Sequence, residues 1–230
     1  MIQLFVCRLK EIEEELFHQL LVNLPKERQH HVLRFRQYED RLRSMIGNLL
    51  MHMQLAKQLQ CAPVELNYQV NQFGKYELVN QILHFNLSHA GQYVIGAISD
   101  RPVGIDLELK QYRDFSFFQS VWTEREKKLF EVDSMNDFYY LWTAKESYVK
   151  WLGTGLATDL KTVDIDYDGL VYQNGKKEPV LVQNIDIDPQ YQCTVCSEYR
   201  AEKVKFLSIE QLITYFMEKS CSKSDTSFCF

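Results

Sequence analysis

The sequence predicts an α+β protein built from two similar halves. Its 230 residues pass twice through a block of helices and strands in which short turns join antiparallel neighbours. Two turn dipeptides, Asp168-Gly169 and Asn174-Gly175, are typical of tight β-hairpins. We therefore expect a first half over residues 1–103, a second over residues 104–218, and a disordered tail over residues 219–230.

The first half is expected to start with a strand and continue with helices. Residues 1–7 are mostly apolar, and residues 11–21 carry apolar side chains at helical spacing. Pro25 suits the first turn of another helix, where a missing N–H is tolerated. The helical pattern then extends to about Gln60, with a stripe of leucine and methionine typical of a core.

Strands follow the helices of the first half. Residues 82–88 and 92–99 predict a hairpin around Ala90-Gly91, and residues 103–109 predict the strand after it. In the first of these strands, Asn86 and Ser88 fall on the face opposite the apolar side chains. We expect that face to point outward.

The second half repeats the pattern. Thr123 and Glu126 have the spacing of a capping box, and a helix is expected over residues 137–152 with Gly153 as its stop. A last helix is expected over residues 208–218. Between these helices the sequence predicts strands over residues 162–167, 170–173, 180–187 and 192–197.

Composition excludes several classes of function. A net charge of −5 argues against general nucleic-acid binding, although residues 26–43 are locally basic. No apolar run is long enough to span a membrane, and residues 1–7 do not resemble a signal peptide. The scattered cysteines are expected to be reduced thiols, so we expect a cytoplasmic protein.

Two segments, residues 104–108 and 142–150, carry the strongest chemical signal. Strand alternation places Asp106 and Glu108 on one face, and helical spacing places Glu146 and Lys150 on one stripe. Three carboxylates and an ammonium group suit a divalent cation that holds a phosphate-bearing ligand. Taken separately, the segments are also compatible with a solvated strand face and an ordinary helical ion pair.

Further candidates are weaker. His89 lies at the end of a predicted strand, where its imidazole could reach a phosphate or a leaving group. A turn histidine bonded to the backbone is the alternative. Lys75 follows a turn at Phe73-Gly74 and supplies one positive charge.

Together, the segments at 73–75, 86–89, 104–108 and 142–150 resemble the signatures of Sfp-type 4′-phosphopantetheinyl transferases. The resemblance runs from near Pro25 to about residue 156. It implies a pseudo-dimer of two α+β halves with coenzyme A bound between them. It also implies transfer of phosphopantetheine to a carrier-protein serine, with release of adenosine 3′,5′-bisphosphate.

The same resemblance implies roles for the candidate residues. Asp106, Glu108 and Glu146 would bind Mg²⁺ beside the pyrophosphate. Catalysis would involve Glu146 as the base or its positioner, Lys150 at the leaving group, and His89. Contacts to coenzyme A would come from Arg28, Arg43, Lys75, Ser88, His89 and Lys150.

Some points stay open at this level. The alignment near Pro25 is ambiguous by one residue, so either Arg28 or His31 would contact the 3′-phosphate. The expected partners are apo carrier domains of peptide or polyketide synthetases, or an acyl carrier protein, as in antibiotic biosynthesis. The alternatives are a metal-dependent phosphohydrolase acting on a diphosphate such as coenzyme A, and a non-catalytic carrier-binding protein. A duplicated fold favours a monomer.

Overall fold

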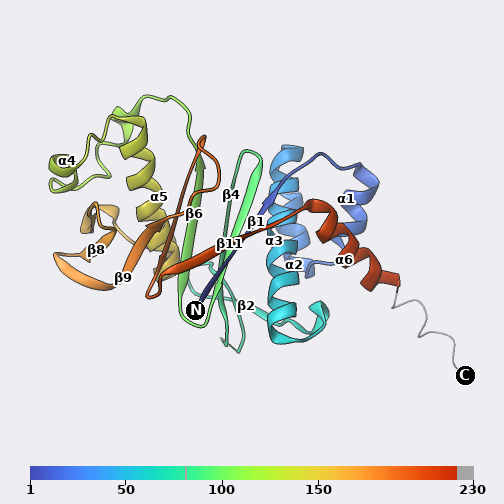
Figure 1. The fold of residues 1–230 in the computed structure, drawn as a ribbon. Coiled ribbons are helices and arrows are strands. Elements are labelled where there is room, and N and C mark those ends of the chain that lie inside the picture. The colour runs from blue at the N-terminus through green and yellow to red at the C-terminus, as the bar shows by residue number, and fades with distance from the viewer. Residues whose placement is uncertain (81, 222–230) are drawn as a thin grey trace, which may run out of the picture.

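The computed structural model describes residues 1–80 and 82–221, with two sheets packed face to face between helices (Figure 1). One sheet has the order β11-β1-β5-β4, formed by Ala201–Leu207, Ile2–Arg8, Tyr93–Ser99 and His84–Ala90. The other has the order β6-β10-β9-β8-β7, formed by Val103–Leu109, Tyr191–Ser197, Lys176–Asn184, Leu170–Gln173 and Val163–Ile165.

Helices cover the outer face of each sheet (Figure 1). The first sheet is covered by α1 (Glu14–Leu21), α2 (Lys26–Leu33), α3 (Tyr38–Leu59) and α6 (Ile209–Cys221). The second is covered by α5 (Met135–Leu152), with the one-turn helix α4 (Glu126–Leu129) beside it. Each half thus packs one long helix on a mostly antiparallel sheet, which confirms the predicted α+β class.

Short elements complete the described chain. A small hairpin pairs β2 (Tyr68–Val70) with β3 (Tyr76–Leu78). Single 3₁₀ turns occur at Pro63–Glu65, Phe115–Phe118, Gly155–Ala157 and Leu160–Thr162. No helix in residues 1–80 and 82–221 combines the length and the apolar character that a membrane crossing requires.

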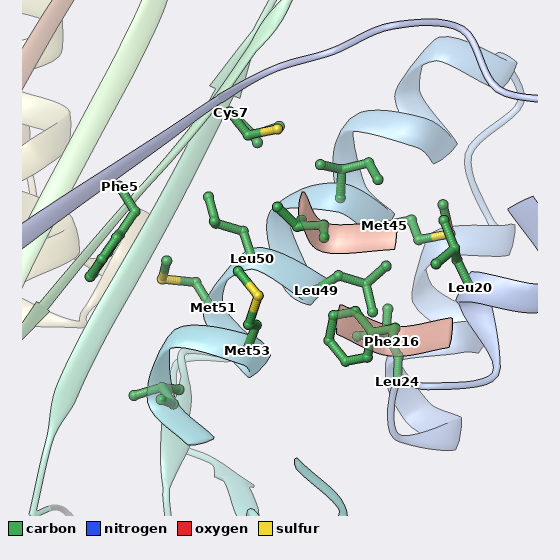
Figure 2. Packing of buried hydrophobic residues seen from close by; sticks show 14 of the residues in the cluster. Phe5, Cys7, Leu20, Leu24, Met45, Leu49, Leu50, Met51, Met53 and Phe216 are labelled. Carbon is green, nitrogen blue, oxygen red and sulfur yellow. The ribbon is translucent and has the colours of Figure 1, made fainter. Parts of the chain in front are cut away.

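The core forms because strand alternation supplies two apolar faces to the first sheet. Leu4 and Val6 of β1 point between the sheets, whereas Phe5 and Cys7 point toward α3. Figure 2 shows the second set meeting the leucine and methionine stripe of α3, with Phe216 of α6 alongside. Full burial of such a side chain stabilises the fold by about 1.5–3 kcal/mol.

The turn and cap signals in the sequence are confirmed. Thr123 N donates to Glu126 Oε2 at 3.0 Å, and Glu126 N donates to Thr123 Oγ1 at 3.1 Å. Asn174 and Gly175 have φ values of 51° and 74°, as a tight hairpin turn requires. Gly153 ends α5 in the left-handed conformation with φ at 72°.

The end of the chain differs from the prediction. No strand was expected between residues 197 and 208, yet β11 pairs in parallel with β1, with Val204 opposite Leu4. Residues 203–206 alternate lysine with apolar side chains, a signal that predicts an edge strand. The final helix runs to Cys221, so residues 219–221 are helical and not tail. The rest of the predicted tail lies outside the described residues.

The chain crosses between the halves at its end. β11 joins the sheet that contains β1, and α6 packs into the helical layer around α3. Both elements follow residue 197 in sequence. The division into residues 1–103 and 104–218 stays a prediction, and these last two elements pack with the first half.

Candidate active site

The two sheets meet where β4 lies beside β6. Asn86 Oδ1 accepts a hydrogen bond from Ile105 N at 2.9 Å, and Ser88 Oγ accepts one from Leu107 N at 3.3 Å. Side chains thus replace the backbone ladder between these two strands. The prediction that this face of β4 points outward is therefore wrong for Ser88. Ser88 is buried, because the second half covers it.

A glycine allows α5 to lie directly on β6. A Cβ atom at Gly104 would sit 2.0 Å from Ser147 O and 2.4 Å from Trp151 N. No side chain fits in that space, so any larger residue would push the helix away. The close approach brings the lysine of α5 onto the carboxylates of β6.

Lys150 and Asp106 form the centre of the site. Lys150 Nζ lies 2.6 Å from Asp106 Oδ1 and also donates to Ser88 Oγ at 3.1 Å and Ile105 O at 3.2 Å. Ser88 donates to the same carboxylate oxygen at 3.0 Å. Asp106 Oδ2 is buried and has no hydrogen-bond partner. One oxygen of this carboxylate is thus committed and the other remains an open acceptor.

The two glutamates share the electrostatic field of Asp106. Burial, followed by the nearby Asp106 charge, raises the pKa of Glu146 above its ordinary value. The same two causes raise the pKa of Glu108, whose Oε1 accepts from Trp142 Nε1 at 3.3 Å. The charge of Asp106 therefore acts on each of the two glutamates.

The chemistry of these donors fits a hard divalent cation. Within residues 1–80 and 82–221, no group of three or more histidine, cysteine, aspartate or glutamate side chains is arranged so that it could hold a metal ion. The open Oδ2 atom of Asp106 nevertheless offers a buried oxygen, and a cation would offset the Asp106 charge, which is the second cause, after burial, of the raised pKa values of the two glutamates.

A cavity of about 500 Å³ opens beside Lys150. Of the predicted site residues, Arg28, Lys75, Glu146 and Lys150 line it. Its other walls come from the turn at Phe73-Gly74, strands β3 and β4, the end of α5 and the segment after that helix. Both halves of the chain therefore contribute to one cavity.

The turn that carries Lys75 is fastened to the end of α5. Lys75 Nζ donates to Lys150 O at 2.7 Å, and Asn71 Nδ2 donates to Gly153 O at 3.0 Å. An ammonium group is favourable at a helix C-terminus, where carbonyl oxygens lack partners within the helix. Burial lowers the pKa of Lys75.

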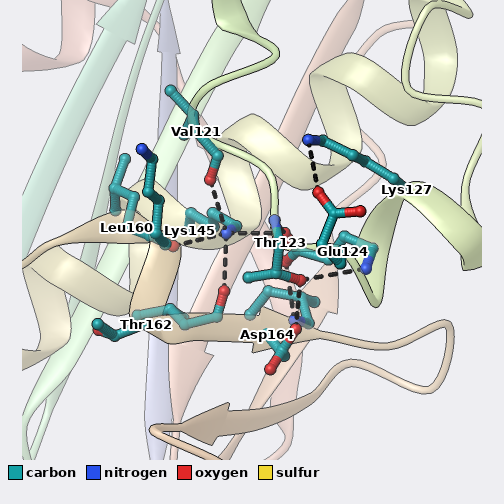
Figure 3. Close-up of polar contacts among 12 residues, drawn as sticks. Val121, Thr123, Glu124, Lys127, Lys145, Leu160, Thr162 and Asp164 are labelled. Atoms are coloured by element: carbon teal, nitrogen blue, oxygen red, sulfur yellow. Dashed lines mark hydrogen bonds and ion pairs between the residues drawn. The ribbon is translucent and has the colours of Figure 1, made fainter.

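A second lysine of α5 points away from the cavity. Lys145 and Glu126 form an ion pair at 2.8 Å, and neither side chain is exposed. Lys145 Nζ also donates to three backbone carbonyls, those of Val121, Leu160 and Val163. Figure 3 shows the ammonium group enclosed by these loops. Lys145 therefore ties α5 to its neighbours.

Comparison with known proteins decides the identity. The family described as the 4′-phosphopantetheinyl transferase superfamily matches residues 102–196, and the one described as 4′-phosphopantetheinyl transferase, N-terminal, matches residues 11–101. The 4′-phosphopantetheinyl transferase gsp of Aneurinibacillus migulanus is 30% identical, with 96% of this chain and 98% of that protein covered. The chain belongs to the 4′-phosphopantetheinyl transferases.

Other relatives agree. The 4′-phosphopantetheinyl transferase Sfp of Bacillus subtilis (strain 168) is 28% identical over 78% of this chain and 85% of its own length. The L-aminoadipate-semialdehyde dehydrogenase-phosphopantetheinyl transferase of Saccharomyces cerevisiae is 30% identical over 70% and 65%. The protein is therefore a transferase that moves 4′-phosphopantetheine from coenzyme A to a carrier protein, as predicted. No comparison supports the phosphohydrolase alternative.

Of the two residues left open near Pro25, Arg28 lines the cavity of this transferase and His31 does not. The Arg28 side chain lines the cavity and lies over the ring of Tyr76, with 3.5 Å between its Cζ and the ring centre. His31 is exposed and does not line the cavity. Partial burial of the imidazole, followed by the charges of Arg28 and Arg34, lowers the pKa of His31 and disfavours its protonated form.

Three predicted contacts to coenzyme A lie outside the cavity wall: Arg43, Ser88 and His89. Arg43 is held by Asp40 at 2.6 Å and donates to Gly91 O at 3.0 Å. Burial, Arg43 and Lys150 lower the pKa of His89, which favours a neutral imidazole. The structure thus places His89 in the field of both cations, although neither it nor Arg43 lines the cavity.

Sequence reasoning missed two residues that shape the site. Tyr76 supports Arg28, and Asn86 links β4 to β6. The polar side chain of Asn86 in an otherwise core-forming strand was a usable signal. Nothing in the sequence pairs Tyr76 with Arg28, because the contact joins α2 to β3 only in the folded chain.

Proposed function

We propose that the transferase binds coenzyme A in the cavity between its halves, with the pyrophosphate against Lys150 and the carrier serine next to Glu146. The observation that carries this proposal is the presence of Lys150 and Glu146 at the wall of one cavity, with Asp106 paired to Lys150 and close enough to raise the pKa of Glu146. Phosphoryl transfer depends on such charge neutralisation and on in-line positioning.

The proposed reaction forms one bond and breaks one. The serine oxygen attacks the phosphorus that carries the pantetheine arm, and the bond from that phosphorus to the bridging oxygen breaks. Glu146 takes the serine proton, directly or through water, and its raised pKa suits it to that role. The Lys150 ammonium offsets the charge that develops on the departing adenosine 3′,5′-bisphosphate.

We further propose that Asp106, Glu108 and Glu146 hold Mg²⁺. When bound, the ion would neutralise phosphate charge and orient the pyrophosphate oxygens. Asp106 Oδ2 is the oxygen that lacks another partner, which supports its assignment as a ligand. Lys150 remains bonded to the other oxygen of the same carboxylate and holds it in place.

The remaining contacts concern substrate binding. Arg28 and Lys75 line the cavity and would hold phosphates of coenzyme A. The cavity wall does not include Ser88, His89 or Arg43. In this proposal Ser88 acts through its hydrogen bond with Lys150. Arg43 adds positive charge nearby, and the imidazole of His89 adds a hydrogen-bonding group. The proposed location is the cytoplasm, where thiols such as the free Cys7 and Cys61 stay reduced.

A transfer assay tests the proposal. Incubating the protein with coenzyme A, Mg²⁺ and a panel of apo carrier domains should add one phosphopantetheine mass to a carrier, and excess chelator should abolish transfer until Mg²⁺ is restored. Asp106→Ala and Glu146→Ala should each lose most of the rate. Transfer that survives chelation, or normal turnover in both variants, would refute the metal assignment. The panel compared by kcat/KM would identify the preferred carrier class.

A further inference from the structure

Arg28 has an unusual environment for a residue at a cavity wall. Its guanidinium lies on the face of Tyr76 at 3.5 Å, a cation–π contact. Its Nε atom is buried and has no hydrogen-bond partner. A guanidinium carries several donors in a rigid fork, and a buried donor without a partner is costly. The group is therefore placed to receive an acceptor from a ligand.

The ring beneath Arg28 is itself fixed by aromatic packing. Tyr76 stacks on Tyr68, with ring centres 4.6 Å apart and an angle of 13° between the planes. Phe85 packs edge-on against Tyr76, with ring centres 6.4 Å apart and an angle of 87° between the planes. Tyr76 thus has little freedom to turn away from the cavity.

The stack continues into the core of the first half. The hydroxyl of Tyr68 lies 2.7 Å from Nδ1 of His52, which is buried on α3. Burial lowers the pKa of His52 to about 4, so the imidazole that shares this hydrogen bond with the tyrosine hydroxyl is neutral near pH 7. A continuous set of contacts therefore runs from α3 through two tyrosines to Arg28.

We infer that Tyr76 is a positioning residue that holds Arg28 against the adenosine-side phosphate of coenzyme A. This inference rests on the proposed function and adds a residue that no resemblance assigned. A flexible arginine loses rotamer freedom when it binds an anion, and a preformed support removes much of that loss before the ligand arrives. Tyr76 itself need not touch the ligand.

The test compares Tyr76→Leu with Tyr76→Phe. The leucine variant removes the ring and should raise KM for coenzyme A about tenfold with kcat almost unchanged, because the effect is on binding. The phenylalanine variant keeps the ring and should restore KM to within about threefold. With dephospho-coenzyme A, which lacks the 3′-phosphate, the leucine variant should lose little. Tyr167→Leu, at an exposed tyrosine of another loop, is the matched control.

A double-mutant cycle separates positioning from general damage. Adding Tyr76→Leu to Arg28→Ala should change KM no further, because the arginine that the ring supports is already absent. Additive losses, or equal losses with coenzyme A and dephospho-coenzyme A, would overturn the inference. Calorimetric titration of coenzyme A reads the same effect without a carrier. If the wild-type protein binds coenzyme A but modifies no carrier, the proposed function fails while the titration still decides the role of Tyr76.

Discussion

Helix α5 carries two ion-paired lysines that differ in use. Lys145 pairs with Glu126, with both side chains fully buried and three backbone carbonyls as further acceptors. Lys150 pairs with Asp106, but its own side chain is 27% exposed and lines the cavity. The first lysine fastens the helix to the loops around it (Figure 3), and the second faces a ligand space.

An ion pair in a motif does not by itself identify a catalytic group. Both lysines belong to the segment 142–150 that suggested the activity. What separates them is the surroundings of each ammonium group, because Lys145 meets only fixed protein acceptors and Lys150 meets a cavity. Variants at Lys145, His52 and Lys150, each with its control, test this distinction.

The largest effect is expected at the buried pair. Lys145→Met should lower the free energy of unfolding by about 3–5 kcal/mol, because it leaves the Glu126 carboxylate buried without its partner. Urea denaturation followed by circular dichroism measures the loss. The double variant Lys145→Met/Glu126→Leu should recover much of it, since two apolar side chains remove both buried charges.

An exposed pair provides the control for this test. Lys127 and Glu124 lie 2.9 Å apart, but the glutamate side chain is 81% exposed. Lys127→Met should leave the urea midpoint unchanged within error. Equal losses at Lys127 and Lys145 would show that burial does not separate the two pairs.

His52 is a buried base without a carboxylate partner, so it tests the effect of burial without an ion pair. His52 is bonded to a tyrosine hydroxyl, and burial lowers its pKa to about 4. Above pH ~6.5 the imidazole is neutral in both folded and unfolded chains. As the pH falls from about 6.5 to 4, the unfolded chain gains the proton first. His52 should therefore reduce the free energy of unfolding by up to roughly 3 kcal/mol over that window.

The measurement is urea unfolding at a series of pH values. His52→Phe should flatten the slope between pH 6.5 and 4 relative to the wild-type protein, whereas His30→Leu, at an exposed histidine, should retain it. Parallel slopes for the wild-type and His52→Phe proteins would contradict the neutral buried imidazole.

Among Lys145, His52 and Lys150, the smallest change in the free energy of unfolding is expected at Lys150, although its loss is the most visible in an activity assay. Lys150→Met should lower kcat about 100-fold, because the ammonium no longer offsets charge on the leaving group. The protein should remain folded at the assay temperature, since this side chain is partly exposed. Initial rates of carrier modification, with the folded fraction checked by circular dichroism, measure the effect. A rate within threefold of the wild-type rate would show that Lys150 is not a catalytic residue.

Much of the fold follows from local patterns in the sequence. The capping box at Thr123 and Glu126, the turn at Asn174-Gly175 and the stop at Gly153 each occur as predicted, because they depend on neighbouring residues. Strand β11 was missed, since its alternation of lysine with apolar side chains covers only residues 203–206 and its pairing partner is at the other end of the chain.

The candidate site, like the fold, combines features set by local sequence patterns with contacts between distant segments. The sequence by itself determined that Asp106, Glu108, Glu146 and Lys150 lie on a strand face and a helix stripe, because alternation and helical periodicity are local properties. Their grouping with Lys75 and His89 matched a family signature, which the comparisons confirmed at the level of the family.

Only the tertiary structure decided which neighbours each group meets. It placed Lys145 among carbonyl oxygens and Lys150 at a cavity, and it set Tyr76 beneath Arg28. These outcomes depend on how closely α5 approaches β6 and on how two sheets join, which are contacts between distant segments. A sequence specifies the residue types for such contacts, whereas burial and geometry, which appear only after packing, assign their roles.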